Sequence, residues 1–187
     1  MRVRHCLLLL FLVSPAFAVA LELTNEDLFF DVHAVTLSIS DQVEDGCLPR
    51  PDSVLASTAA VLRGDKFRIV DPDEAPPVTP DVQITALGYA ADQDCVVFFS
   101  ISLVKSVTAT VPYSESLPDS YQQTPLAVEL GVYESLLIGQ LEGMQGQLER
   151  EAEKGGNEFL LAVERARASV ESNWPLLWEA YASATDD

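Results

Sequence analysis

The ten residues from Cys95 to Val104 constrain the fold more than any other stretch of this chain. They read CVVFFSISLV, and their first half is apolar at consecutive positions. A strand that is apolar on both faces belongs in the middle of a sheet. Val107 to Tyr113 alternates and predicts a second strand, paired with the first in a hairpin near Lys105-Ser106. Pro112 places that second strand at a sheet edge.

The residues before the central strand predict strands and helices in alternation. From Phe29 to Ser40 the second half alternates apolar and polar residues, which is the period of a half-buried strand. Pro51-Asp52 predicts the start of a helix that Gly64 ends, and Lys66 to Val70 predicts a short strand. Residues 71–80 contain four prolines and three acidic residues, which predicts a loop.

Residues 79–91 fit two kinds of secondary structure. Thr79-Pro80-Asp81 has the chemistry of a helix cap, and Leu87-Gly88 suits a helix end, so a helix is the favoured interpretation. The alternative is a strand on which Val82, Ile84 and Ala86 alternate with polar residues. That strand would lead into a hairpin through Asp92-Gln93-Asp94.

The last third of the chain predicts helices. Residues 126–154 place apolar side chains at steps of four, three, four, four, three and four, close to a heptad repeat. Gly155-Gly156 predicts the end of this helix, and a second helix from Asn157 would return beside it as an antiparallel hairpin. Pro175 then begins a short final helix. The heptad positions are Leu126, Leu130, Tyr133, Leu137, Leu141, Met144 and Leu148.

Together these elements predict an α/β fold, in which helices pack on a small mixed β-sheet. An antiparallel helical hairpin and a short terminal helix follow at the carboxyl end. The expected division is a signal peptide at 1–20, an α/β domain with one disulfide at 21–118, and a helical part at 119–187.

Residues 1–20 have the layout of a cleavable secretory signal. Two arginines precede a short apolar run from Cys6 to Val13, and small residues follow Ser14-Pro15. The run is much shorter than the roughly 20 residues that span a membrane, so an uncut anchoring helix is the weaker alternative. We therefore expect cleavage after Ala20, with Ala18 as the second choice. The mature protein would be periplasmic or secreted, without stable membrane insertion.

The charge of the chain is strongly negative. Without the two arginines of the predicted signal, nine basic residues remain against 29 acidic ones, for a formal charge of −20. Such a surface repels nucleic acid and attracts basic proteins. We therefore expect no nucleic-acid partner, although an acidic surface can also serve solubility alone.

Two cysteines follow the predicted signal, Cys47 and Cys95. An even number of cysteines in an oxidising compartment predicts a disulfide between them. The alternative, a nucleophilic thiol, needs a base that lowers the pKa of the thiol. His33 is the only histidine available for that role, and it lies in an extended apolar stretch. The structural role is therefore the better interpretation.

The sequence contains no clear catalytic or metal-binding arrangement. His33 has no sequence context that marks it as the base of a serine triad, and one histidine with paired cysteines does not suit zinc. Three acidic groups lack the twelve-residue pattern of a calcium loop, so we expect them to face solvent. We expect no cofactor and no bound metal. The groups are Asp71, Asp73 and Glu74; Asp92 and Asp94; and Glu149, Glu151 and Glu153.

Two apolar features are candidates for a binding surface. One is the aromatic face of the final helix, because exposed aromatic side chains often anchor interfaces. Its alternative role is to close the core of its own domain. The other is the heptad seam at 126–148, which could join two copies of the chain or pack inside one subunit. The aromatic face consists of Trp174, Leu177, Trp178 and Tyr181.

Residues 29–104 resemble a group of envelope domains in the predicted order strand, helix, strand, helix, strand. The segment Ala86 to Leu103 (ALGYAADQDCVVFFSISL) is similar to their helix ending in Ala-Leu-Gly, followed by an acidic turn and an apolar strand. These are the amino-terminal domain of TolB-type periplasmic proteins and the outer-membrane activators of peptidoglycan synthases. The resemblance implies a domain that binds other proteins without catalysis. Phe98-Phe99 replaces the glycine that follows the aliphatic run in that group, and the helical hairpin is an addition.

The function predicted from the sequence is that of an exported, non-catalytic binding or scaffold protein of the cell envelope, with another envelope protein as its partner. Two alternatives remain open. A hydrolase of an envelope polymer could act through two carboxylates alone. A carrier of a small ligand would require an enclosed apolar cavity.

Overall fold

The structure is a computed structural model that describes residues 27–44, 46–65, 67–110 and 123–185. The predicted signal peptide at 1–20 and the last residues of the predicted edge strand, 111–113, lie outside the described residues.

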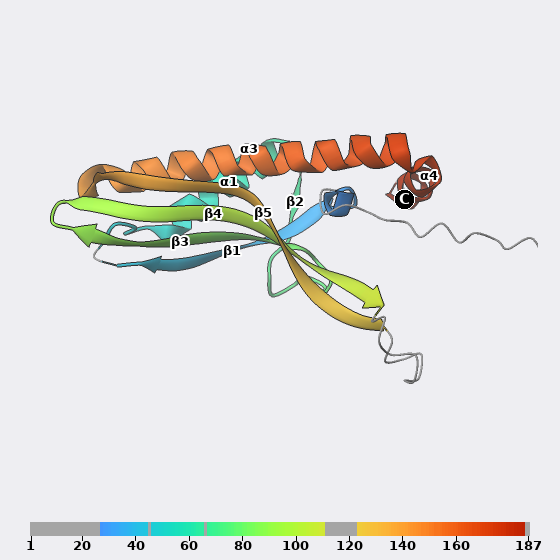
Figure 1. Cartoon of the computed structure of the whole chain (residues 1–187), viewed down its shortest axis with the longest axis horizontal. Helices are drawn as coiled ribbons and strands as arrows, with labels where there is room; N and C mark the ends of the chain where they lie inside the picture. Colours follow the sequence, from blue (N-terminus) through green and yellow to red (C-terminus); the bar gives the residue numbers. More distant parts are fainter. Residues whose placement is uncertain (1–26, 45, 66, 111–122, 186–187) are drawn as a thin grey trace, which may run out of the picture.

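One five-stranded mixed sheet organises the molecule, with the strand order β2-β1-β3-β4-β5 (Figure 1). β1 is parallel to both β2 and β3, whereas β3, β4 and β5 pair antiparallel. The predicted central strand therefore does lie between two neighbours. The strands are β1 (Ala34–Val43), β2 (Arg68–Ile69), β3 (Asp81–Ala91), β4 (Asp94–Thr110) and β5 (Gln123–Gln140), preceded by the 3₁₀ turn η1 (Asp27–Phe29).

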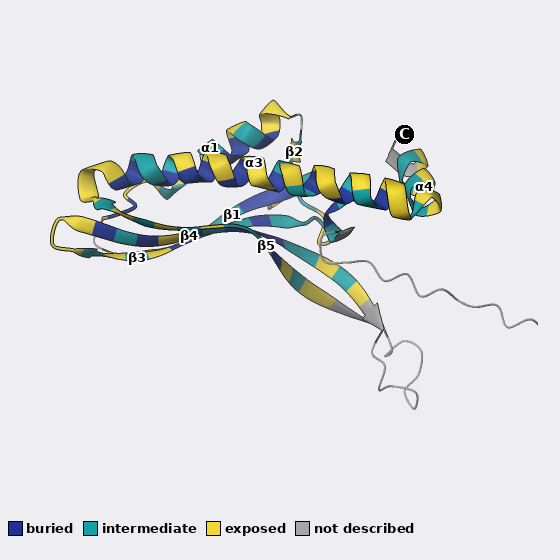
Figure 2. Ribbon diagram, turned by 45° about the horizontal axis from the view of Figure 1, so that its top comes forward, coloured by how far each residue is buried: buried dark blue, intermediate teal, exposed yellow. Residues whose placement is uncertain are grey.

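Among the described residues, two helices cover one face of this sheet and none covers the other (Figures 1 and 2). α1 (Pro51–Gly64) and α3 (Leu141–Asn173) lie side by side on it, and Thr58 of α1 donates a hydrogen bond to the carbonyl oxygen of Ala152 in α3, at 3.3 Å. α4 (Pro175–Thr185) follows at the far end of α3. The mixed α/β fold class is thus confirmed.

The core lies between the sheet and these helices. Alternate residues of β3 and β4 point into it, which is the period of a strand with one covered face. α3 contributes side chains at helical spacing along one face, seen as the blue stripe in Figure 2. The central buried residues are Val82, Ile84 and Ala86 of β3; Val97, Phe99, Ile101 and Leu103 of β4; and Met144, Leu148, Phe159 and Val163 of α3.

The favoured helix at 79–91 is wrong, and the alternative strand is correct. Asp81 to Ala91 forms β3 and pairs with β1 on one side and β4 on the other. The turn at its end holds Asp92 at a φ of 58°, a left-handed conformation that aspartate tolerates better than most residues. The Ala-Leu-Gly segment that carried the family resemblance therefore lies in a strand.

The turn predicted at Lys105-Ser106 is absent, because β4 runs on to Thr110. Lys105 pairs with Val128 of β5 and Ser106 pairs with Ala127, so the backbone there stays extended. A single 17-residue strand replaces the predicted hairpin of two shorter strands. Beyond the other strands, β4 and β5 project together as a two-stranded extension (Figure 1).

The prediction of a helical hairpin, with one helix at 126–154 and a second from Asn157, is also wrong. Gln123 to Gln140 forms β5, which pairs with β4 over its whole length. The remaining residues form one uninterrupted helix, α3, of 33 residues and about 50 Å. The sheet and core extend past position 118, since β5 and α3 pack on elements that precede it.

Gly155-Gly156 lies in the middle of α3 and does not end it. A Cβ atom on Gly155 would overlap Cδ1 of Ile101 and lie 3.2 Å from Cδ1 of Tyr133. A Cβ atom on Gly156 would lie 3.2 Å from Cβ of Val61 in α1. The two glycines therefore allow α3 to approach the sheet and α1 closely, which outweighs the poor helix propensity of glycine.

Cys47 and Cys95 form a disulfide with an S–S distance of 2.06 Å, as the sequence predicts. Both residues are fully buried. The bond joins the loop before α1 to the second residue of β4, so it holds that loop beside the hairpin between β3 and β4.

Candidate binding surface

The face of the sheet without helices carries an ordered group of apolar side chains. Leu87 of β3, Phe98 of β4 and Leu136 of β5 are direct partners across three strands. Two residues further along, Tyr89, Val96 and Ile138 form a second such row. Because residues two apart on a strand share a face, the two rows lie on one surface. We call these six residues the sheet-face patch.

The patch is open to solvent among the described residues. Leu136 is 64% exposed and Ile138 is 67% exposed, while Leu87 and Tyr89 are each about half exposed. A shallow cavity of about 480 Å³ lies over the same strands, and the side chains of Gln42 and Glu44 complete its lining. Contiguous apolar surface of this kind on a soluble protein usually marks an interaction site.

The apolar patch is bordered by polar and acidic residues. On the next register position, Thr85, Ser100 and Glu134 lie side by side, and at the hairpin end Asp94 is paired with Gln140. Glu44 lines the cavity on the β1 side. An apolar centre with a polar rim is the composition of a protein-binding surface.

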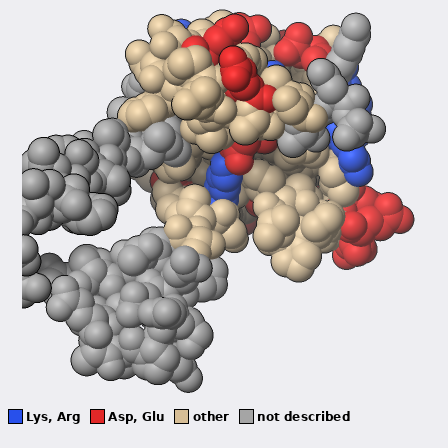
Figure 3. All heavy atoms as spheres, turned by 90° about the vertical axis from the view of Figure 1, so that its right-hand side faces the viewer, with Lys and Arg blue, Asp and Glu red and all other residues tan. Residues whose placement is uncertain are grey.

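The whole chain is acidic, like the border of the patch. Its formal net charge is −18 at pH 7. Seen from the end of the molecule that carries α4, acidic side chains form several separate groups, and basic side chains are sparser (Figure 3). A surface of this sign favours basic partners over acidic ones.

The sheet-face patch is not among the surfaces predicted from the sequence, although the sequence contains a signal for it. Phe98-Phe99 and Leu136-Leu137-Ile138 are consecutive apolar residues, so each strand carries apolar side chains on both faces. On β4 this pattern also fits a strand covered on both faces, and on β5 the spacing of the apolar residues also fits a helix. The structure covers only one face, where Phe99 and Leu137 lie.

The aromatic face of the final helix lies at the end of the molecule opposite the hairpin between β3 and β4 (Figure 1). The rings of Trp178 and Tyr181 are 5.5 Å apart between centroids, and Tyr181 contacts Phe30 edge-on at 5.4 Å. Trp174 and Leu177 are half-buried, as are these two aromatic residues. Tyr181 thus packs against Trp178 and against Phe30 in the segment after η1, and the role of the four residues in partner binding stays a prediction.

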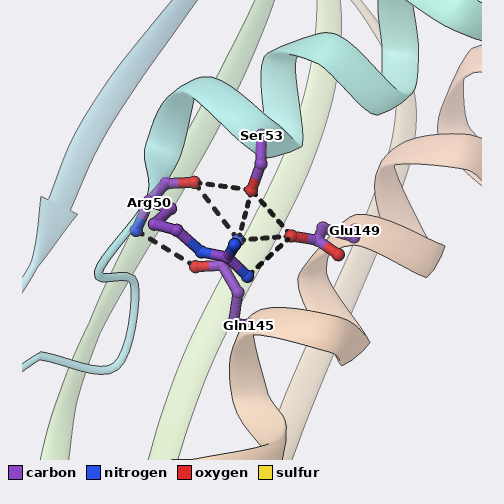
Figure 4. Close-up of polar contacts among 4 residues, drawn as sticks. All are labelled: Arg50, Ser53, Gln145 and Glu149. Carbon is purple, nitrogen blue, oxygen red and sulfur yellow. Dashed lines mark hydrogen bonds and ion pairs between the residues drawn. The ribbon is translucent and has the colours of Figure 1, made fainter.

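A polar cluster joins the start of α1 to α3 (Figure 4). The amide of Gln145 pairs with the backbone of Arg50, accepting from its N–H at 3.1 Å and donating to its carbonyl at 3.2 Å. Gln145 also donates to Ser53 at 2.8 Å, and Ser53 donates to Glu149 at 2.6 Å. The hydrogen bonds from Ser53 and Gln145 hold the pKa of Glu149 below its ordinary value. These hydrogen bonds link the start of α1 to α3.

A second polar group lies where α3 crosses β5. Tyr133 donates a hydrogen bond to Glu151, and Lys154 forms an ion pair with Glu151 at 2.5 Å. Burial alone would raise the pKa of Glu151, but the hydrogen bonds from Lys154 and Tyr133 outweigh it and lower that pKa. Burial and the neighbouring carboxylate raise the pKa of Tyr133. Glu151 is therefore buried and paired, which corrects the prediction of a solvent-facing group.

The remaining candidate residues lie in separate places. His33 is exposed and its Nδ1 lies 3.0 Å from the carbonyl oxygen of Asp31, in a cavity of about 290 Å³ that Arg68 and Lys105 also line. Lys105 is ion-paired with Asp31.

Within 27–44, 46–65, 67–110 and 123–185, no three histidine, cysteine or acidic side chains are grouped as metal ligands. None of the helices in these ranges combines the length and apolarity of a membrane-spanning helix.

Comparison with known proteins identifies no family for this chain. No protein-family profile and no curated protein sequence matches it. Among solved structures, a minor lipoprotein from Acinetobacter baumannii is similar over 75% of this chain and 89% of its own, with 6% sequence identity and a TM-score of 0.27. That TM-score is too low to show a common fold, so the comparison carries no functional argument.

Proposed function

We propose that this protein is an exported, non-catalytic binding protein of the cell envelope, and that a partner protein docks on the sheet-face patch. The observation that carries the proposal is the pair of apolar rows, Leu87–Phe98–Leu136 and Tyr89–Val96–Ile138, on the face without helices. Burial of such side chains is worth about 25 cal/mol per Å² of apolar surface removed from water.

The chemistry of the partner follows from the border of the patch. Glu44 and Glu134 flank the apolar rows, and the chain carries a large negative net charge. A complementary partner presents two or three apolar side chains with lysine or arginine beside them. The same charge disfavours a second copy of this chain as the occupant.

Site-specific photo-cross-linking in the producing cell tests this proposal. A photoreactive amino acid at Ile138 is compared with one at Leu161, an exposed apolar residue of α3 away from the patch. We expect a discrete protein adduct at position 138 and none at position 161, and Leu136→Thr should reduce it several-fold. The cross-linked segment of the partner should contain basic residues.

Equal labelling at both positions, or no protein adduct at position 138, would contradict the proposal. An adduct of this chain with itself would assign the patch to self-association.

The role predicted for Trp174, Leu177, Trp178 and Tyr181 is a separate part of the proposal. If the aromatic face of α4 also contacts the partner, a photoreactive residue at the exposed Leu176 should give the same adduct as position 138. Self-association through 126–148 stays a prediction as well, but its basis changes, because 126–140 is a strand and only 141–148 is helical.

A further inference from the structure

The sheet has an incomplete edge beside β1. β2 pairs with β1 only at Ala34 and Val35, after which Val70 donates one more hydrogen bond to the carbonyl of Val35, at 2.9 Å. From Leu37 to Val43, no strand in the described part of the chain pairs with this side of β1. β1 itself continues for eight more residues, all of them paired with β3 on the other side.

The direction of the backbone groups at this edge follows from the register between β1 and β3. Thr36 donates to the carbonyl of Pro80 at 2.9 Å, and Glu44 donates to the carbonyl of Gly88 at 3.0 Å. Thr36 and Glu44 are eight residues apart in the sequence, as are their acceptors Pro80 and Gly88. The even-numbered residues of β1 between Thr36 and Glu44 therefore also bond to β3. The backbone groups of Leu37, Ile39 and Asp41 therefore point toward the open edge. At Val43 the Asp41 side chain accepts the outward N–H, at 3.0 Å, which ends the open stretch.

An apolar groove runs beside this open edge, between β1 and α1. It has a volume of about 470 Å³, and Leu37, Leu55 and Ile69 contribute apolar surface to it. Asp52 and Asp71 lie along the groove, with Arg63 as its basic residue. Asp41 is exposed at the far end of the open stretch.

We propose that the open edge of β1, from Leu37 to Asp41, binds an extended basic peptide segment of another protein by strand addition. Only an extended backbone offers donors and acceptors at the spacing of Leu37, Ile39 and Asp41. Such a segment would continue the row that β2 begins. Alternate side chains of the segment would enter the groove beside α1, and lysine or arginine residues would face the acidic rim.

This edge is distinct from the sheet-face patch, because strand addition uses backbone groups in the plane of the sheet. A second copy of the chain is disfavoured as the occupant, since pairing two β1 edges would bring two Asp41 side chains and two strongly acidic proteins together.

The test uses the purified protein and a phage library of random dodecapeptides as the probe. Two variants add the same charge to α1: Ala56→Lys, which fills the groove, and Ala60→Lys, which is exposed on the same helix outside the groove lining. We expect enrichment of peptides with alternating apolar and basic residues. A synthetic enriched peptide should bind Ala56→Lys at least about tenfold more weakly than wild type, and Ala60→Lys within about twofold.

Two further readouts identify strand addition itself. N-methylation at alternate residues of the peptide should weaken binding about tenfold, whereas methylation at the residues between them should have little effect. In NMR hydrogen exchange, the amides of Leu37, Ile39 and Asp41 should exchange quickly in the free protein and slow down when the peptide binds.

Several results would overturn the inference. One is that no peptide is enriched more strongly on the wild-type protein than on Ala56→Lys. Another is a selected peptide that binds wild type and Ala56→Lys equally, or that slows exchange at β5 instead of β1. A different result would be that, without peptide, the amides of Leu37 and Ile39 exchange more slowly as the protein concentration rises. That would show that two copies of the chain pair through this edge.

Discussion

At the scale of single residues, the structure depends on side chains that the sequence does not mark as important. Gly155 is one, because its missing side chain is what allows α3 to rest on Ile101 and Tyr133. Glu151 is another, because a carboxylate in a helix of alternating charges becomes a buried partner of Tyr133 and Lys154. Each of these contacts joins α3 to the sheet or stabilises it there.

Replacing Gly155 by valine should destabilise the protein by at least about 2 kcal/mol. The new side chain would overlap Ile101 and crowd Tyr133, both of which pack under α3. Gly143→Ala is the matched control, since nothing lies within 4 Å of a Cβ atom at that position. It should leave stability unchanged or raise it by up to about 1 kcal/mol. Urea unfolding followed by circular dichroism measures both, and equal stability of the two variants would contradict the packing described for α3.

Glu151→Gln should lower the free energy of unfolding by about 1–2 kcal/mol at neutral pH, since it removes a carboxylate that accepts two hydrogen bonds. The folded pKa of Glu151 is depressed, so its contribution is fully present above the unfolded pKa of about 4.3. It is lost as the pH falls through the folded pKa.

Urea titrations of wild type and Glu151→Gln between pH 7 and pH 3.5 measure the loss of unfolding free energy that the substitution causes. This loss should be constant down to about pH 5 and become smaller below it. Glu153→Gln removes one exposed charge from the same helix and should cost less at pH 7. A penalty that grows toward acid pH would show that the folded pKa is raised.

At the scale of elements, the sequence predicts those whose signals are local. α1 follows from Pro51 and Asp52 at its start, β4 from its apolar run, and α4 from Pro175. The errors concern elements whose form depends on distant partners. β5 is a strand because β4 offers it a continuous line of backbone groups, although the spacing of Leu126, Leu130 and the following leucines also fits a helix.

The same limit applies to α3 and to the candidate surfaces. Gly155-Gly156 reads as a helix end when considered alone, whereas contact with Ile101 and Val61 explains why a helix continues through it. The sheet-face patch requires knowledge of which face the helices cover. Tertiary packing determines which face is covered, and the periodicity of apolar residues along one strand does not reveal it.

The disulfide is an element-scale link that the sequence does predict. Replacing Cys47 and Cys95 together by serine should lower the free energy of unfolding by roughly 4 kcal/mol, because the bond closes a loop of 48 residues. Denaturant unfolding of the double variant, compared with the wild type before and after reduction, measures this effect. A loss well below 1 kcal/mol would mean that the loop before α1 is held without the disulfide.

At the scale of the whole molecule, the notable property is the asymmetry of the sheet. One face is covered by α1 and α3, and the other exposes two apolar rows with an acidic border. A fold that needed only stability and solubility would place polar side chains there, as β1 does at Ser38, Ser40 and Gln42. The change from polar to apolar side chains along this face is the observation on which we base the proposed partner site.

Carbene footprinting with mass spectrometry can show whether a partner covers the sheet-face patch in the cell. The protein is labelled once inside its own cellular compartment and once after purification, and modification is read at individual side chains. We expect Leu136, Ile138 and Tyr89 to be labelled several-fold less in the cell, and the exposed Leu161 on α3 to be labelled equally in both samples. Equal labelling of the sheet-face patch in both samples would contradict the claim that a partner covers it.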